Sequence, residues 1–132
     1  MTAIRKRPHS NVLLVIKAHE GVGAKKLQEL MLETNHDKAF FADILHLSPK
    51  TIDRYIKEDK KFNPTESEKM LKLEQVYEWG KEVFGNITEF NKWIIKPAYG
   101  LGGLIPKDLM QTMGGLELVE EELIRIAYGA LA

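Results

Sequence analysis

The stretch FFADILHLSPKTIDRYIK occupies residues 40–57 and decides the expected fold. On each side of its middle, apolar residues recur three or four positions apart, which is the spacing of one helical face. These residues are Phe40, Phe41, Ile44 and Leu45, and then Ile52, Tyr55 and Ile56. Between the two groups, Ser48 is a suitable N-cap because its hydroxyl accepts an amide hydrogen bond, and Pro49 suits the first helical position. The stretch therefore predicts two short helices separated by a tight turn.

The two expected helices fit a helix-turn-helix motif, in which the second helix can lie in the major groove of DNA. Ala42 is small where the two helices must approach each other, and the motif's shared core is apolar. The core positions are Phe41, Leu45, Leu47, Ile52 and Tyr55. His46 stands where such turns usually have glycine, so a left-handed backbone there would be strained. An inert helical hairpin stays open as the alternative.

The second of these helices carries the candidate DNA-binding residues. They are the outward-facing Ser48, Lys50, Thr51, Arg54 and Lys57. Their hydroxyl, ammonium and guanidinium groups donate hydrogen bonds to phosphates and to guanine edges. Residues 1–63 contain 12 Lys and Arg against 8 Asp and Glu, whereas residues 64–132 contain 7 against 11. The more basic first part would attract a nucleic acid.

A second helix-start signal follows at residues 63–66, where the sequence Asn-Pro-Thr-Glu provides a cap, a proline at the first helical position and a glutamate at the third. We expect it to separate an N-terminal helix-turn-helix module, residues 1–62, from a C-terminal domain, residues 63–132. The helix that it opens is expected to end before Gly85 and carries two neighbouring apolar stripes. This helix is therefore expected to pack on both modules or on another chain, or else to be the central core helix of a monomer.

The rest of the chain also shows helical spacing of apolar residues. A flexible lead-in is expected at residues 1–11, which have no periodicity. Further helices are expected at residues 12–19, 24–35, 86–97, 106–112 and 116–129. A strand is the alternative for residues 12–19. Residues 99–105 are expected to form a connector, and Gly114 and Gly115 are expected to end the helix at residues 106–112. A solvated face is expected at Glu117, Glu120, Glu121 and Glu122, with Glu121 paired to Arg125. No segment alternates at period two, so the expected fold is all-α.

Composition narrows the possible chemistry. The chain has 132 residues, enough for one domain or for two small modules that share a core. It has no cysteine, which excludes disulfides, thiol nucleophiles and cysteine-ligated metals, and its four histidines form no helical pair. No catalytic constellation stands out, so no metal, no cofactor and no enzymatic activity are expected. The apolar run at residues 12–16 is too short for a signal peptide or a membrane span, so we expect a cytoplasmic protein without membrane contact.

A series of short motifs follows one order along the last two thirds of the chain. They are Thr51-Ile52-x-Arg54, Glu66-x-Glu68-x-x-Leu71-x-Leu73, Val83-Phe84-Gly85, Trp93-Ile94-x-x-Pro97, Leu101-Gly102-Gly103-x-x-Pro106-x-Asp108-Leu109-Met110-x-Thr112, and then Gly115, Val119, Leu123, Arg125-Ile126 and Tyr128-Gly129. In this order and spacing they are specific, and the chain from about Phe40 onward resembles the Xre/MbcA/ParS family of bacterial antitoxins. Two departures are His46 in the turn and Lys72, where the family usually has arginine.

The resemblance implies an antitoxin of a type II toxin-antitoxin system, in which an Xre-like helix-turn-helix is joined to a C-terminal toxin-binding domain. Such antitoxins are not enzymes. They cover the active-site cleft of a co-encoded toxin, commonly of the RES type, which consumes NAD or transfers ADP-ribose from it. Many also form homodimers and repress their own operon. The implied partners are therefore a RES-type toxin, operator DNA and a second copy of the chain. A helix-turn-helix transcriptional repressor with an unrelated partner is the alternative.

Residues near the end of the chain are the candidates for toxin contact, because a small helical core cannot easily cover them. They are Arg125, Tyr128, Gly129, Leu131 and Ala132. Tyrosine and arginine are enriched at protein interfaces, and glycine allows the chain to leave a helix. If these residues do not carry the contact, the connector at residues 99–105 is the alternative surface.

Overall fold

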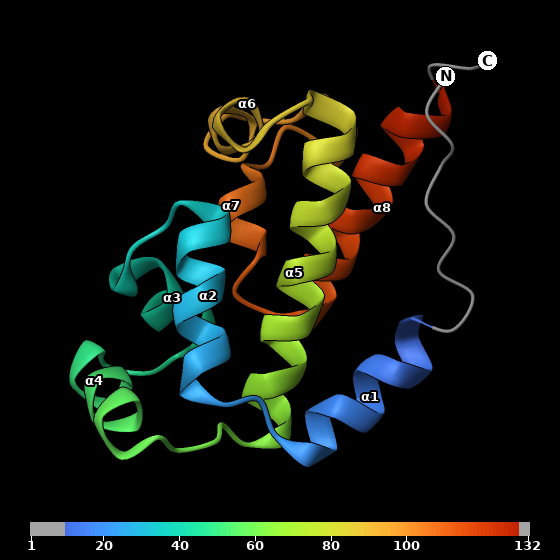
Figure 1. Cartoon of the computed structure of the whole chain (residues 1–132). Coiled ribbons are helices and arrows are strands. Elements are labelled where there is room, and N and C mark those ends of the chain that lie inside the picture. The colour runs from blue at the N-terminus through green and yellow to red at the C-terminus, as the bar shows by residue number, and fades with distance from the viewer. Residues whose placement is uncertain (1–9, 130–132) are drawn as a thin grey trace.

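The computed structural model describes residues 10–129, which form eight α-helices and one short 3-10 helix, with no β-strand among them (Figure 1). In chain order they are α1 (Ser10–Glu20), α2 (Ala24–Thr34), α3 (Lys38–Leu45), α4 (Pro49–Glu58), α5 (Pro64–Phe84), α6 (Ile87–Trp93), η1 (Tyr99–Leu101), α7 (Pro106–Leu109) and α8 (Met113–Gly129). The expected all-α fold is confirmed. The expected lead-in at residues 1–11 lies outside the described residues, except for its last two residues, which already belong to α1.

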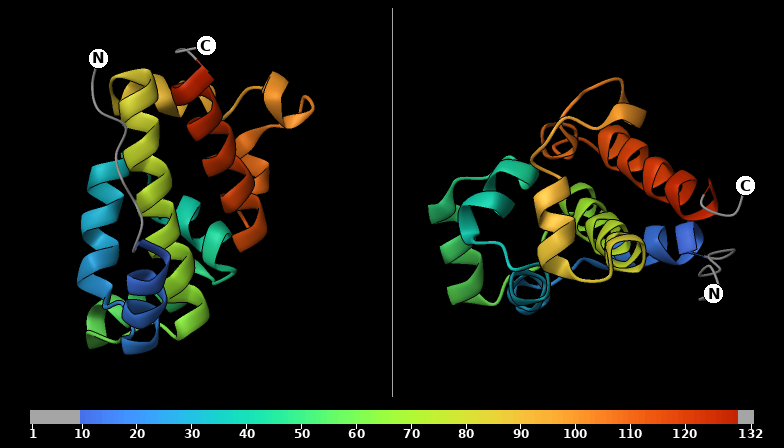
Figure 2. Two further views of the ribbon diagram at one scale, coloured as in Figure 1. Left: turned by 90° about the vertical axis from the view of Figure 1, so that its right-hand side faces the viewer. Right: turned by 90° about the horizontal axis from the view of Figure 1, so that it is seen from above.

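Helix α5 is the central element of the fold. Helices α1 and α8 pack along it on one side, and α2, α3 and α6 contact it elsewhere (Figures 1 and 2). Both apolar stripes of α5 are covered by these neighbours. The buried residues are Met70, Leu73, Val76, Tyr77 and Trp79, and Val83 and Phe84 pack against the same core. Of the alternatives for α5, the structure therefore supports packing on elements from both halves of one chain.

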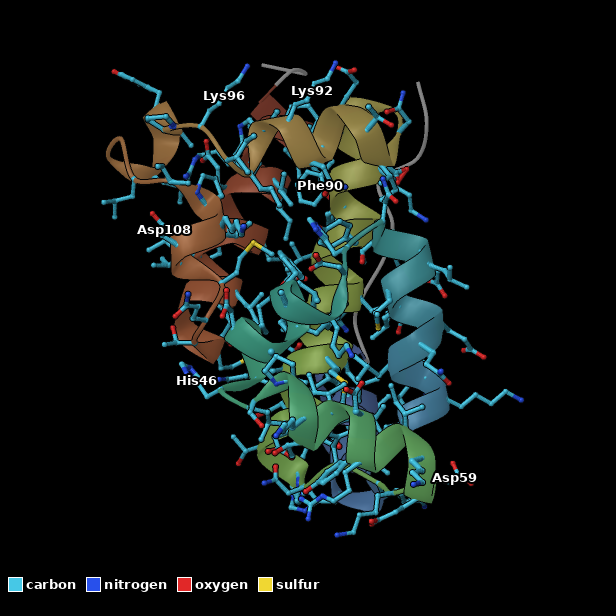
Figure 3. The ribbon with its side chains drawn as sticks, turned by 90° about the vertical axis from the view of Figure 1, so that its left-hand side faces the viewer. His46, Asp59, Phe90, Lys92, Lys96 and Asp108 are labelled. Atoms are coloured by element: carbon cyan, nitrogen blue, oxygen red, sulfur yellow. The ribbon has the colours of Figure 1, made fainter. Side chains whose placement is uncertain are left out.

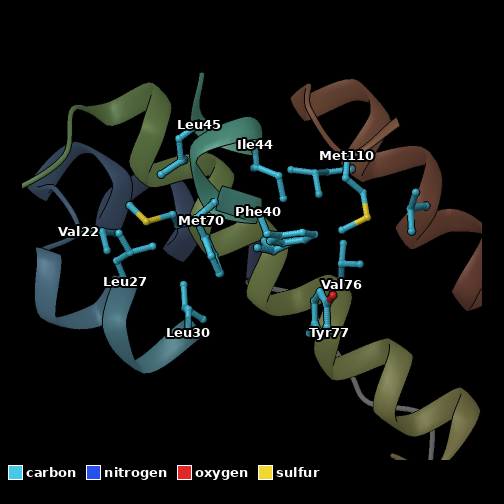
Figure 4. Close-up of a cluster of buried hydrophobic side chains, with 14 of the residues drawn as sticks. Val22, Leu27, Leu30, Phe40, Ile44, Leu45, Met70, Val76, Tyr77 and Met110 are labelled. Carbon is cyan, nitrogen blue, oxygen red and sulfur yellow. The ribbon is translucent and has the colours of Figure 1, made fainter. Parts of the chain in front are cut away.

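The buried side chains form one continuous cluster. It extends from the segment before α2 to Leu123 in α8, and Figure 4 shows Phe40 in its middle, between side chains of α2 and Met110. Elements before and after the start of α5 therefore share one hydrophobic core. The division into modules of residues 1–62 and 63–132 stays a prediction.

The helix starts predicted from capping residues are confirmed. Ser48 Oγ accepts a hydrogen bond at 3.1 Å from the amide three residues further on, at the start of α4. Asn63 and Glu66 form a reciprocal capping box before α5, in which each side chain accepts from the other residue's amide, at 2.7 and 3.2 Å. Asn86 Oδ1 caps α6 by accepting a hydrogen bond from the Glu89 amide at 2.9 Å. Local side-chain chemistry thus fixes where α4, α5 and α6 begin.

Two other helices differ in length from the prediction. Helix α1 covers the expected helix at residues 12–19 and extends beyond it at both ends, so the strand alternative is wrong. Helix α6 ends at Trp93 and is shorter than the helix expected at residues 86–97. The residue before Pro97 is disfavoured in helical conformation, and the chain has turned before it.

The expected boundary between the last two helices is also wrong. Helix α7 ends at Leu109, and Gly114 and Gly115 lie inside the first turn of α8 rather than between two helices. Thr112 explains the difference, since its Oγ1 accepts a hydrogen bond from the Gly115 amide at 3.0 Å and so caps α8. A β-carbon at Gly115 would overlap the carbonyl oxygen of Leu109. Glycine is therefore needed at position 115 for the close approach of α7 and α8.

Replacement of Gly115 by alanine is expected to lower the free energy of unfolding by about 1–3 kcal/mol, because the new methyl group forces α7 and α8 apart. Gly114→Ala is the matched control: no atom lies within 4 Å of a β-carbon at Gly114, and alanine favours the helix by up to about 1 kcal/mol. Urea unfolding followed by circular dichroism measures both variants. Equal unfolding midpoints for Gly115→Ala and the unchanged chain would contradict the packing argument.

A polar network ties the end of α2 to α5 and α6. The Tyr77 hydroxyl donates to Asn91 Oδ1 at 2.8 Å and lies 2.5 Å from His36 Nε2, and Asn91 Nδ2 donates to the Thr34 carbonyl at 2.9 Å. Burial lowers the pKa of His36 and raises the pKa of Tyr77. Both shifts favour the neutral forms of the two side chains.

Candidate functional site

Helix α4 carries four of the five candidate DNA-binding residues, and the fifth, Ser48, is its N-cap. Its inner face is anchored in the core by Ile52, which is fully buried. Ser48, Lys50, Arg54 and Lys57 are exposed, and Thr51 is half-buried. The structure therefore brings the five residues together along one helix, and their contact with DNA stays a prediction.

Several polar and charged side chains of α4 and its cap contact neighbouring residues. The Arg54 guanidinium lies over the ring of Tyr55, 5.5 Å from the ring centre, a cation–π arrangement that restrains it. Asp53 is acidic, but its carboxylate pairs with Lys38 of α3 at 2.5 Å. Ser48 is engaged as the cap of α4. Lys50, Arg54 and Lys57 therefore present three positive charges to solvent along α4.

The turn before α4 is tied to the segment between α7 and α8. His46 adopts the expected left-handed backbone, with φ 56° and ψ 42°, and its Nε2 lies 2.9 Å from the carbonyl oxygen of Gln111 (Figure 3). Lys69 of α5 donates to the same oxygen at 2.9 Å and to the Ile44 carbonyl at 3.1 Å. Burial lowers the pKa of Lys69. No local sequence pattern signals this link, because Gln111 lies 65 residues from His46.

The last turns of α8 hold three of the five candidate toxin-binding residues. Arg125, Tyr128 and Gly129 are exposed there, and Gly129 is the last residue of the helix. The other two candidates, Leu131 and Ala132, lie outside the described residues. The structure thus places the first three on one exposed helix end, while their contact with a partner stays a prediction.

Arg125 is engaged within the chain. Its guanidinium pairs with the carboxylate of Glu122 and donates to the Gly100 carbonyl at 3.2 Å. The predicted pair of Arg125 with Glu121 is therefore wrong, because it is Glu122, with a side chain only 8% exposed, that faces the connector. A β-carbon at Gly100 would overlap the Glu122 carboxylate. The contact between Gly100 and Glu122 was not predicted from the sequence, because only the folded chain brings the two residues together.

The predicted solvated face of α8 is also wrong at Glu120. Lys72 Nζ lies 3.0 Å from Glu120 Oε1, and the two side chains are only 5% and 13% exposed. Lys72 also donates to Gln75 Oε1 at 2.9 Å and to Asn11 Oδ1 at 3.4 Å. One ammonium group therefore joins α1, α5 and α8.

Residues 10–129 contain no group of three or more histidine, aspartate or glutamate side chains placed to hold a metal ion. Within that same part of the chain, none of the helices is both long enough and apolar enough to cross a membrane.

The chain is similar to known antitoxins. Residues 80–129 match the family described as antitoxin Xre/MbcA/ParS C-terminal toxin-binding domain. The chain is 29% identical over 122 residues to the Prs ADP-ribosylating antitoxin of Sphingobium sp. (strain YBL2), which covers 86% of this chain and 77% of that protein. It is also 29% identical over 80 residues to the antitoxin Xre of Pseudomonas putida, which covers 61% of this chain and 50% of that protein.

The region that matches the family includes some of the candidate residues and not others. Arg125, Tyr128, Gly129 and the connector at residues 99–105 lie inside residues 80–129. The candidates on α4 lie before that region. The match therefore bears directly on partner binding by the last part of the chain.

Proposed function

We propose that this chain is an antitoxin of the Xre/MbcA/ParS family, which binds a co-encoded toxin and blocks the toxin's active site. The observation that carries the proposal is the match of residues 80–129 to a toxin-binding domain. The name of the Sphingobium relative associates that protein with ADP-ribosylation, which supports a toxin of the RES type, one that uses NAD. In this proposal the chain acts in the cytoplasm, by binding and not by catalysis.

The exposed end of α8 is the proposed contact with the toxin. Tyr128 offers a large ring with a hydroxyl, and such a ring can stack on the flat surfaces of a pocket shaped for a nucleotide. Arg125 remains 60% exposed while it pairs with Glu122, so its guanidinium can also meet a carboxylate of the partner. Gly129, with Leu131 and Ala132 beyond it, would extend the contact from the helix end.

Coexpression of the chain with the toxin encoded beside it tests this proposal. The expected result is copurification of the two proteins in a fixed ratio, together with restored growth of cells that produce the toxin. A toxin that purifies alone and still stops growth would contradict the proposal.

For the first half of the chain, we propose that α4 lies in the major groove of operator DNA and that the protein represses its own operon. The support is the placement of four candidate residues on α4, with Ser48 as its N-cap, while Ile52 anchors the opposite face of the helix. A chain that binds its operator but no toxin would favour the alternative, a helix-turn-helix repressor with an unrelated partner.

The double variant Lys50→Ala with Arg54→Ala is expected to weaken operator binding by about 1–3 kcal/mol for each side chain that reads a base, and by less for one that binds a phosphate. Lys81→Ala is the matched control, because Lys81 is exposed on α5, away from α4. A mobility-shift titration at fixed salt measures the affinities. Unchanged affinity of the double variant would rule out α4 as the reading helix.

We also propose that the chain forms a homodimer, but the supporting observation is the surface of α1 and not that of α5. The apolar stripes of α5 are covered within the chain, so they no longer argue for a second copy. Helix α1 buries Leu14 and Ala18 against the fold but exposes four large apolar side chains, Val12, Leu13, Val15 and Ile16. A two-fold dimer would cover this surface and match a palindromic operator. We therefore place the dimer contact on α1.

The double variant Leu13→Glu with Ile16→Glu is expected to convert the dimer to a monomer, because four charges would face each other across the two-fold axis. Light scattering at micromolar concentration should return twice 15.1 kDa for the unchanged chain and 15.1 kDa for the variant. Leu32→Glu, on the exposed surface of α2, is the matched control and should stay dimeric. A mass of 15.1 kDa for the unchanged chain would contradict the dimer.

A further inference from the structure

The segment between α6 and α7 exposes a group of large apolar side chains. Tyr99 is 100% exposed, and Ile95 and Leu104 are 56% and 55% exposed. Figure 2 shows this segment, in orange, extending outward from the helical bundle next to α8. Single exposed apolar residues are common, but a group of them on one extended loop is typical of a binding surface.

Backbone hydrogen bonds close this segment into a loop. At its base the Lys107 amide donates to the Ile94 carbonyl at 2.8 Å, and the Ala98 amide donates to the Leu104 carbonyl at 3.0 Å. The Gly103 amide donates back to Ala98 at 2.9 Å. These bonds hold the exposed side chains near one another although they are spread over ten positions of the sequence. We refer to residues 94–107 below as the α6–α7 loop.

The α6–α7 loop is fastened to α8 from one side. The Arg125 guanidinium donates to the Gly100 carbonyl and pairs with the buried Glu122 carboxylate, which lies where a β-carbon of Gly100 would be. Tyr99 is therefore fixed at its backbone while its side chain is free in solvent. A loop that is ordered before binding loses less conformational entropy on binding, so its contacts contribute more to affinity.

We propose that the α6–α7 loop is a second contact surface for the toxin, with Tyr99 as the side chain that enters an apolar pocket of the partner. The inference rests on the proposed function, toxin binding, and assigns a further surface of the chain to it. The loop lies inside the region that matches a toxin-binding domain, and Arg125 makes it continuous with the α8 end that carries Tyr128. Tyrosine is among the residues that contribute most to binding energy at interfaces.

The charge of the loop indicates the kind of pocket that fits it. Residues 94–107 contain no acidic residue and two exposed lysines, of which Lys107 places its ammonium 5.8 Å from the centre of the Phe40 ring, so Lys96 is the lysine left to face a partner. Figure 3 shows Lys96 pointing outward at the same end of the molecule as Lys92. The partner surface that matches is an apolar pocket with carboxylates at its rim, because such a rim attracts the loop and orients it.

Calorimetry with a catalytically inactive form of the co-encoded toxin tests the inference on the full chain. Tyr99→Ala is expected to raise Kd at least tenfold, and Tyr99→Phe to stay within threefold of the unchanged chain, since the ring makes the contact. Because Tyr99 is fully exposed, circular dichroism should show no change in folding. Leu32→Ala, 84% exposed on α2 and outside the matched region, is the control and should not change Kd.

The outcomes separate this inference from the proposed function. If the unchanged chain does not bind the toxin, the proposed function itself is wrong. If the unchanged chain binds and Tyr99→Ala binds equally well, the α6–α7 loop is not a toxin contact and the α8 end alone carries binding. If Tyr99→Ala instead changes the mass measured by light scattering while toxin binding is kept, the loop binds a second copy of the chain, and the inference is overturned.

Discussion

A chain that lacks residues 128–132 is expected to fold and to bind operator DNA but to leave cells unprotected against the toxin. Leu123 is the last buried residue of α8, and Tyr128 and Gly129 are exposed, so the deletion removes no core residue that the structure describes. Loss of Tyr128 and the residues after it should weaken toxin binding by at least about 2 kcal/mol, since large side chains at an interface commonly contribute that much. Growth of cells that coexpress the toxin measures protection.

The truncation has two controls. Circular dichroism reports whether the helices remain, and a mobility shift on operator DNA reports whether α4 still acts. A truncated chain that protects cells as well as the full chain would show that the end of α8 does not block the toxin. The α6–α7 loop, tested by Tyr99→Ala, would then be the surface to examine.

The variant Lys72→Met is expected to lower the free energy of unfolding by about 3–5 kcal/mol. Lys72 and Glu120 form a pair with little exposure to solvent, and removal of the ammonium group leaves the Glu120 carboxylate buried without its partner. The double variant Lys72→Met with Glu120→Leu should regain most of the loss, because an apolar pair leaves no buried charge. Lys72→Arg keeps the charge and should lose the least.

Urea unfolding measures these variants, and an exposed ion pair provides the matched control. Lys92 and Glu89 lie on the surface of α6 with side chains 61% and 51% exposed, so Lys92→Met should cost less than about 1 kcal/mol. If Lys72→Met lowered the free energy of unfolding by no more than Lys92→Met does, the position of Lys72 between three helices would not matter for stability.

The features predicted correctly from the sequence are those that depend on neighbouring residues. Ser48, Asn63 and Asn86 cap helices through side-chain oxygens that reach amides three positions away, so a short pattern contains all the needed chemistry. The apolar spacing of α5 likewise predicted a helix with two buried faces. The placement of the α4 candidates on one exposed helix followed from the same local reasoning.

The features predicted wrongly depend on residues that are distant in the sequence. Gly115 looked like a helix end because glycine weakens helices, but its role is set by the carbonyl of Leu109 on α7. Glu122 looked like a solvated residue on a charged face, but its side chain is buried, next to Gly100 and paired with Arg125. Helical periodicity tells how much of a helix is buried and not which segment covers it, so such contacts require the folded chain.

The single hydrophobic core has a consequence for how long the protein acts in a cell. Because one buried cluster joins side chains from α2 to α8, unfolding of either half exposes the other half as well. A protease that captures the opened chain would end both proposed activities, repression and protection, in one event. A substitution that loosens the core at Phe41 of α3, which packs against α4, would therefore shorten the proposed protection against the toxin as much as it shortens the proposed repression.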